Sequence, residues 1–252
     1  MIDHSGRVAA VTGSARGIGK SIARTLAASG ANVAILDVNG DGAQACAREL
    51  KEECSVITWA ASLDISSKEQ VVDVFERLTA EIGAVDILVN NAGITTNVNV
   101  ITEMPMDAWD REISINLSGA FYCAKQVLPS MAERQWGRIV NISSLAGAIG
   151  GFGQCSYAAA KAGLLGLTKT IALEHARNNI TANAVLPGLV NTEAAAAVPE
   201  KLRERITNTA PIRRMAEPEE IANTVSFLAS AEASYINGAP IFVTAGAELF
   251  TF

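Results

Sequence analysis

The chain has 252 residues, of which 49% are hydrophobic and 18% charged, which excludes a disordered polypeptide and allows an α/β domain with a large core. Its formal net charge of −6 argues against nucleic acid or an anionic membrane as a general partner, because the overall field repels both. No run approaches about 18 apolar residues, and the N-terminus passes from polar residues directly into a strand pattern, so the sequence predicts neither a membrane span nor an export signal.

The cysteines indicate the redox compartment. Cys46, Cys54, Cys123 and Cys155 form neither a C-x-x-C pair nor a spacing typical of a metal site. We therefore expect reduced thiols, a cytoplasmic location and no bound metal.

Short β-rich runs alternate with longer helical patterns from the N-terminus onward. The first half predicts strands at 7–12, 32–37, 55–64 and 86–90, with helices at 17–29, 42–53 and 67–82. The second half predicts helices at 107–135, 156–178 and 217–229 and strands at 137–143, 181–186 and 239–244. Apolar strands separated by crossover helices predict an α/β fold, a Rossmann-type doubly wound parallel sheet of about seven strands with helices on both faces. We expect a single domain over residues 1–252.

Residues 192–215 depart from this alternation. They are rich in alanine, then charged, and interrupted by Pro199 and Pro211, with no strand signal. We expect them to form an insertion that covers a site and to line a substrate pocket together with residues 94–105 and 145–156. The pocket lining should be mostly apolar and built of small residues, which does not identify the substrate.

A glycine-rich turn, "TGSARGIG", follows the first predicted strand and opens a helix. Gly13, Gly17 and Gly19 remove side chains that would block the approach of a pyrophosphate, whose charge would meet the N–H groups at the helix start. In this strand–turn–helix context the turn predicts a dinucleotide site, although an ordinary tight turn is the alternative.

Two charged residues near this turn bear on the choice of dinucleotide. Asp37 ends the second strand, where a carboxylate accepts hydrogen bonds from the ribose hydroxyls of NAD. Arg16 lies inside the turn, where a guanidinium could meet the 2′-phosphate of NADP. A carboxylate within about 4 Å of that phosphate would oppose it by roughly 4 kcal/mol per unit charge. Asp37 therefore favours NAD over NADP.

Tyr157 and Lys161 lie four residues apart in "YAAAK", on one face of a predicted helix. A phenol titrates near 10, too high for a general base at neutral pH, so an adjacent ammonium is needed to lower its pKa. The pair predicts a proton-transfer site.

The ordered motifs resemble those of the short-chain dehydrogenase/reductase family over nearly the whole chain. "TGSARGIG" resembles the cofactor turn of that family, "NNAG" (90–93) its sheet-stabilising motif and "YAAAK" its Y-x-x-x-K motif. Further similar segments are "LDIS" (63–66), "SINLSGAF" (114–121), "NISSLAG" (141–147) and "PGLVNT" (187–192).

The resemblance implies roles for individual residues. Tyr157 would be the acid/base, and Ser144 would bind the substrate oxygen; Ser144 is preferred to its neighbour Ser143 because it precedes Tyr157 by thirteen residues. Lys161 would hold the nicotinamide ribose, and Asn116 would position a water in a proton relay. The implied cofactor-binding residues are Gly13, Arg16, Gly17, Ile18, Gly19, Asp37, Asp64, Ile65, Asn91, Ala92, Gly93, Tyr157, Lys161, Val190 and Thr192.

Three functions remain open. The leading one is an NAD(H)-dependent oxidoreductase that interconverts a secondary alcohol, or a hydroxyacyl compound, and its ketone. The second is an NADPH-dependent 3-oxoacyl-acyl-carrier-protein reductase, which would need basic docking residues near the site; available arginines are Arg134, Arg177, Arg213 and Arg214. The third is a catalytically silent scaffold subunit.

The resemblance also implies a homotetramer joined through the helices near 107–135 and 156–178 and through the C-terminal helix and strand. The apolar tail "AELFTF" is a candidate to reach a neighbouring subunit.

Overall fold

A parallel sheet of seven strands forms the centre of the molecule in the computed structural model, which describes residues 2–249. The strand order is β3-β2-β1-β4-β5-β6-β7, and every neighbouring pair is parallel. The strands are β1 (Val8–Thr12), β2 (Asn32–Asp37), β3 (Thr58–Ser62), β4 (Ile87–Asn90), β5 (Gly137–Ile142), β6 (Ile180–Pro187) and β7 (Pro240–Val243). The predicted α/β fold with its parallel sheet is confirmed.

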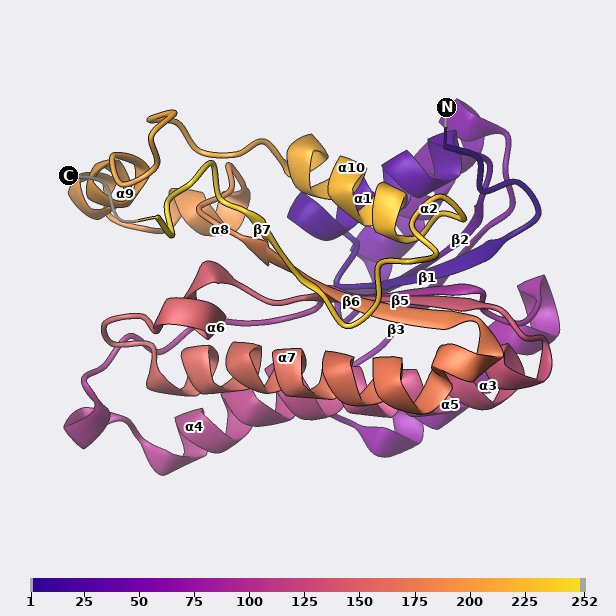
Figure 1. Ribbon diagram of the computed structural model, residues 1–252, viewed down its shortest axis with the longest axis horizontal. Coiled ribbons are helices and arrows are strands. Elements are labelled where there is room, and N and C mark those ends of the chain that lie inside the picture. The colour runs from indigo at the N-terminus through magenta and orange to yellow at the C-terminus, as the bar shows by residue number, and fades with distance from the viewer. Residues whose placement is uncertain (1, 250–252) are drawn as a thin grey trace.

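Helices cover both faces of this sheet (Figure 1). On one face lie α1 (Gly17–Ala28), α2 (Gly40–Cys54) and α10 (Pro218–Leu228). On the other lie α3 (Lys68–Ile82), α4 (Met106–Ile113), α5 (Gly119–Glu133) and α7 (Cys155–His175). The short helices α6 (Leu145–Ile149), α8 (Glu193–Ala196) and α9 (Glu200–Thr207) follow strands β5 and β6 beyond their carboxyl ends.

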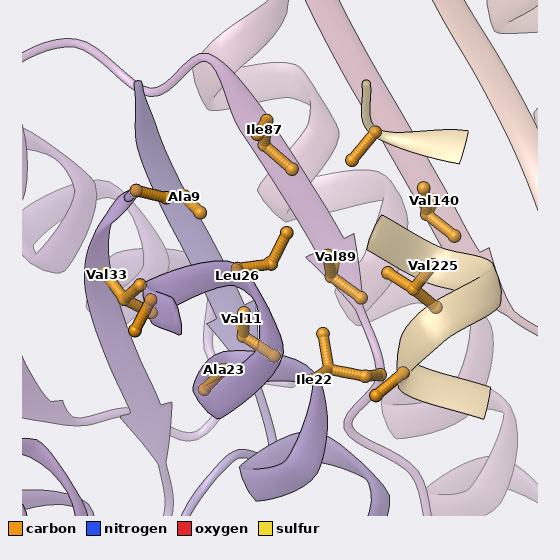
Figure 2. Close-up of a cluster of buried hydrophobic side chains, with 14 of the residues drawn as sticks. Ala9, Val11, Ile22, Ala23, Leu26, Val33, Ile87, Val89, Val140 and Val225 are labelled. Carbon is orange, nitrogen blue, oxygen red and sulfur yellow. The ribbon is translucent and has the colours of Figure 1, made fainter. Parts of the chain in front are cut away.

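The central strands are buried on both sides, which explains their almost uninterrupted apolar sequences. All five residues of β1 and all eight of β6 are buried. Ile22 and Leu26 of α1 pack against Val11 and Val89 of the sheet, and Val225 of α10 completes this layer (Figure 2). Burying side chains of this size stabilises the fold by about 1.5–3 kcal/mol each.

Three predicted elements differ from the observed ones. The helix expected over 107–135 is divided into α4, a π-helical turn (Ser114–Ser118) and α5. Residues 192–215, expected to form an insertion without a strand, contain the helices α8 and α9. The strand expected at 55–64 shortens to β3, because Ser55 adopts a left-handed backbone conformation at the end of α2. Two single-turn 3₁₀ helices, Ile101–Glu103 and Ala176–Asn178, complete the elements.

No helix within residues 2–249 is long and apolar enough to cross a membrane. The last three residues of the predicted tail, 250–252, lie outside the described residues.

Candidate active site

The predicted site residues converge at the carboxyl ends of the parallel strands, around the point where the strand order reverses between β1 and β4. In open α/β sheets this crevice is the usual ligand site. The glycine turn follows β1, "NNAG" follows β4, and Ser144 follows β5.

The glycine turn leaves no room for side chains at two of its positions. A Cβ on Gly13, whose φ is +64°, would lie 2.7 Å from the Cα of Ala92, and a Cβ on Gly19 would collide with the Gly13 carbonyl. Gly13 must also adopt the left-handed region, which disfavours other residues. The turn and the β4 segment are therefore packed backbone to backbone.

Helix α1 begins without a side-chain cap and without an acidic residue in its own first turn. Arg16, the residue before the helix, makes no capping hydrogen bond, and the first turn carries no acidic residue. By contrast, α2 and α3 begin with side-chain caps from Asn39 and Ser67 and carry an acidic residue in their first turns. The free donors and positive dipole end of α1 fit a pyrophosphate.

The Asp37 carboxylate is held beside this turn at the end of β2. It accepts the backbone N–H of Ala15 at 3.0 Å and that of Asn39 at 3.0 Å. Arg16 is exposed and forms no ion pair among the described residues. A fixed carboxylate and a free guanidinium thus border the same turn.

Asn91 ties the end of β4 to the end of β1. Its Nδ2 donates to the carbonyls of Thr12 and Gly13, each at 2.9 Å, and its backbone N–H donates to the Thr12 hydroxyl at 3.1 Å. The Ala92 N–H shares that hydroxyl at 3.1 Å. The Asn91 side chain therefore holds the turn in place, a structural contact that the sequence did not reveal.

Two of the implied cofactor-binding residues, Asp64 and Ile65, follow β3. Asp64 accepts hydrogen bonds from the backbone N–H and hydroxyl of Ser66, at 2.9 and 2.6 Å. Ile65 is buried against Gly119, where a Cβ would lie 2.6 Å from its Cδ1. The carboxylate orders its own loop, and Ile65 fixes that loop to α5.

A buried chain of amides supports the centre of the site. Asn90 Nδ2 donates to Asn141 Oδ1 at 2.8 Å across β4 and β5, and Asn141 Nδ2 donates to Thr168 Oγ1 of α7 at 2.8 Å. This chain fixes α7, which carries Tyr157 and Lys161, onto the sheet. It gives a physical basis for the predicted sheet-stabilising role of "NNAG".

Tyr157 and Lys161 share the inner face of α7. Lys161 is buried, its Nζ donates to the Ile142 carbonyl at 2.8 Å, and it lies 5.6 Å from the centroid of the Tyr157 ring. A Cβ on Gly93 would lie 3.1 Å from this Nζ, so Gly93 keeps the backbone of the β4 loop close to the ammonium.

The pKa values of this pair are shifted by burial. Burial lowers the pKa of Lys161 to about 8. Burial raises the pKa of the Tyr157 phenol, and the nearby Glu112 charge acts in the same direction, while the Ser144 hydroxyl lowers it. The predicted lowering of the phenol pKa by Lys161 is not met in the chain alone: burial raises this pKa, and the Lys161 ammonium donates to the Ile142 carbonyl.

The two neighbouring serines have different contacts. Ser143 is buried and donates its hydroxyl to the Lys161 carbonyl at 2.7 Å. Ser144 is half-buried, begins α6 and accepts the Ala146 N–H at 3.2 Å, so its hydroxyl proton stays free to turn toward the site. The geometry favours Ser144 for contact with a substrate oxygen.

Asn116 occupies the π-helical turn and uses both ends of its amide. Its Oδ1 accepts the Ile94 N–H and its Nδ2 donates to the Ile94 carbonyl, each at 2.8 Å. Such π turns are frequent at functional sites. Here the turn brings Asn116 against the loop after β4, close to Gly93.

Val190 and Thr192 lie on the segment that reaches back over the glycine turn. Val190 is buried and forms a β-bridge with Ala216, and the Thr192 hydroxyl caps α8 by accepting the Ala195 N–H at 3.3 Å. A Cβ on Gly17 would meet the Thr192 Cγ2 at 3.5 Å. Residues 190–192 therefore lie beside the glycine turn, and their predicted contact with the cofactor stays a prediction.

The arginines considered for docking of a carrier protein do not all lie near the site. Arg134 pairs with Asp86, which precedes β4, and Arg177 precedes β6, so both lie at the amino edge of the sheet, opposite the site. Arg214 pairs with Glu220. The expectation of a docking patch near the site is wrong for Arg134 and Arg177.

Comparison with known proteins agrees with this geometry. Residues 13–248 match the family described as "Enoyl-(Acyl carrier protein) reductase". The chain is 40% identical to a 3-oxoacyl-(acyl-carrier-protein) reductase FabG of Aquifex aeolicus, covering 96% of this chain and 97% of that protein. It is 46% identical to an acetoacetyl-CoA reductase of Rhizobium meliloti, covering 95% and 98%.

Among solved structures, a putative gluconate dehydrogenase from Agrobacterium tumefaciens superposes with a TM-score of 0.94 at 32% identity, covering 99% of this chain and 98% of that one. All three of these relatives are named for an oxidation or reduction, but each name gives a different substrate. The chain belongs to the short-chain dehydrogenase/reductase family and is an oxidoreductase that acts on hydroxyl or keto groups with a nicotinamide cofactor.

Proposed function

We propose that the protein interconverts a secondary alcohol and its ketone with NAD(H), and that Tyr157 is the acid/base. The observation that carries the proposal is the juxtaposition of Tyr157, Lys161 and Ser144 at the strand ends that also carry the glycine turn. A silent scaffold would be expected to lack part of this set, and Asn116 is present as well.

The residues of the chain divide the proton-transfer work. Tyr157 would give its phenolic proton to the oxygen of a ketone, or take the proton of an alcohol, while the Ser144 hydroxyl steadies that oxygen. The ammonium of Lys161 would favour the phenolate once charge develops there. The nicotinamide ring, when bound, supplies or accepts the hydride.

The choice of dinucleotide is supported by the contacts of Asp37. Its carboxylate is fixed by two backbone N–H groups and would accept the ribose hydroxyls of NAD, whereas it would repel a 2′-phosphate. We expect Asp37→Asn to keep the Ala15 contact and remove the charge. Its kcat/KM with NADP should rise about tenfold relative to NAD. A ratio equal to that of the unmodified protein would contradict the assignment to NAD.

A 3-oxoacyl thioester is the second candidate substrate. Its support is the identity of 40–46% to relatives named 3-oxoacyl-(acyl-carrier-protein) reductase and acetoacetyl-CoA reductase. The substrate side is also apolar, with Val98, Ile149 and Phe152 exposed at its rim.

Turnover can test both candidates together. Absorbance of the reduced nicotinamide is followed with acetoacetyl-CoA, 3-hydroxybutyryl-CoA and a series of simple secondary alcohols and ketones, each with NAD(H) and NADP(H). Tyr157→Phe should lower kcat at least 1,000-fold and leave the dissociation constant of the dinucleotide within about twofold, because the phenol oxygen is removed and the ring remains. Retained turnover in that variant would overturn the role of Tyr157.

We also propose that the chain assembles as a homotetramer in the cytoplasm. Support comes from apolar side chains left exposed on the predicted assembly elements, Phe121 of α5, Leu173 of α7 and Phe242 of β7. The four cysteines are free, in keeping with a reducing compartment. Light scattering should give about four times the chain mass of 26.3 kDa. A mass equal to one chain would contradict the proposal.

A further inference from the structure

The side chain of Glu112 is the most buried carboxylate close to Tyr157 and has no part in the proton transfer described above. It is the only buried residue of α4 and is fully inaccessible to solvent. Its neighbours Asp110 and Arg111 on the same helix are exposed. Figure 1 shows α4 lying beside the N-terminal end of α7, below the sheet.

No cation neutralises Glu112 among the described ion pairs. Hydrogen bonds take the place of a cation. Oε1 accepts the backbone N–H groups of Thr96 at 2.9 Å and Asn97 at 3.2 Å, and Oε2 accepts the Ser156 hydroxyl at 2.6 Å. A buried carboxylate persists only where its oxygens are satisfied in this way.

These partners belong to two separate segments of the site. Thr96 and Asn97 lie in the loop after β4, which borders the substrate side, and Ser156 lies in the first turn of α7, next to Tyr157. The single side chain of Glu112 therefore joins three pieces of chain: α4, the 94–97 loop and the start of α7.

Asn116, in the π-helical turn that follows α4, extends this connection four residues after Glu112. Asn116 holds Ile94 by two hydrogen bonds of 2.8 Å, while Glu112 holds Thr96 and Asn97. The loop is thus fixed at residues 94, 96 and 97 by two side chains four residues apart. Ser156 has no other side-chain partner among the described hydrogen bonds.

We propose that Glu112 is a positioning residue, which orients the first turn of α7 with Tyr157 against the 94–97 loop and so sets the alignment of substrate and phenol. This inference rests on the proposed function. Displacement of a reacting group by about 1 Å can lower the rate 100-fold, so loss of this connection should affect turnover without affecting the glycine turn.

The test compares Glu112→Ala with Asp110→Asn, an exposed carboxylate on the same helix. Hydrogen–deuterium exchange of the cofactor-free protein should show faster exchange at residues 94–97 and 155–158 in Glu112→Ala only, because the N–H groups of Thr96 and Asn97 lose their acceptor. We expect kcat/KM to fall at least tenfold, mainly through kcat, and the dissociation constant of the dinucleotide to stay within twofold.

Two further variants keep the test decisive if Glu112→Ala does not fold. Ser156→Ala removes only the link to α7 and should lower kcat about threefold to tenfold. Glu112→Gln keeps the size and removes the charge that raises the pKa of Tyr157, while Lys161 of the same helix as Tyr157 stays 5.6 Å from its ring. The pH–rate profile for alcohol oxidation should move to lower pH by about half a unit. A merely structural role would not move this profile.

The outcomes separate this inference from the proposed function. If the unmodified protein turns over no alcohol, ketone or thioester, the proposed function fails, and the exchange data alone decide whether Glu112 fixes the loop. If it turns over substrate, and Ser156→Ala and Glu112→Gln keep its kcat and pH profile as the control Asp110→Asn does, Glu112 has no positioning role. Faster exchange with reduced kcat supports the inference.

Discussion

The two halves of the cleft are built in different ways. On the cofactor half, the β1–α1 turn, the end of β2 and the end of β4 are joined by backbone packing and by fixed polar side chains such as Asn91 and Asp37. On the substrate half, the segments 94–105 and 145–154 present exposed apolar side chains, with Ile101 at 76% and Phe152 at 91% exposure. The shape of the cofactor half therefore depends on backbone geometry. The shape of the substrate half depends on side chains that can be substituted.

Substitution of Lys161, which lies between the two halves, is expected to have the largest effect. Lys161 is buried with its pKa lowered to about 8, so keeping it charged at pH 7 costs the fold about 3 kcal/mol. Lys161→Met should remove this cost and leave the Ile142 carbonyl unpaired, a loss of about 1–3 kcal/mol. We expect turnover to fall about 1,000-fold while the melting temperature at pH 7 stays equal or rises by a few degrees.

The pH dependence of stability checks the same residue. The folded-state pKa lies below the usual lysine value of 10.5, so the unfolded chain binds more protons above about pH 8. The stability of the unmodified protein should therefore rise from pH 7.5 to 9.5 relative to Lys161→Met, as followed by urea denaturation. If the free energy of unfolding of the two proteins changed in parallel with pH, burial would not lower the pKa of Lys161.

A change in the glycine turn tests whether backbone geometry governs the cofactor half. In Gly19→Ala the new Cβ would collide with the Gly13 carbonyl and lie 2.5 Å from Asn91 Nδ2. We expect dinucleotide affinity to fall about 100-fold and stability by about 1–3 kcal/mol, measured by fluorescence titration and thermal unfolding. Gly166→Ala in α7 is the matched control, since nothing lies within 4 Å of its Cβ position. A stability loss in the control would instead indicate that a second chain packs on α7.

The difference between the halves also explains what could be predicted from the sequence. The sheet, its parallel order and the position of the glycine turn follow from apolar strands and spaced glycines, because those features are local. The spacing to Tyr157 distinguished Ser144 from Ser143 as the substrate-binding serine. The contacts agree with this choice, because the Ser143 hydroxyl donates to the Lys161 carbonyl.

Long-range contacts account for what the sequence did not reveal. Glu112 looks like one more charge on an exposed helix, and only the fold brings Thr96 and Ser156 to its oxygens. The direction of the Tyr157 pKa shift was also wrong for the chain alone, because the extent of burial is a tertiary property. The π turn at Asn116 has no local signature in a continuous helical pattern.

The smallest expected effect belongs to the substrate half. Phe152→Ser removes an exposed aromatic ring at the rim, which packs on little of the protein itself. If an apolar substrate covers that ring, KM should rise about fivefold, which corresponds to about 1 kcal/mol of lost apolar burial, and kcat and the melting temperature should not change. Ile57→Ser, 54% exposed ahead of β3 at the opposite edge of the sheet, provides the control and should leave KM unchanged. A drop of several degrees in the melting temperature of Phe152→Ser would mean that the rim is part of the packed structure, and the contrast between the two halves would then be wrong.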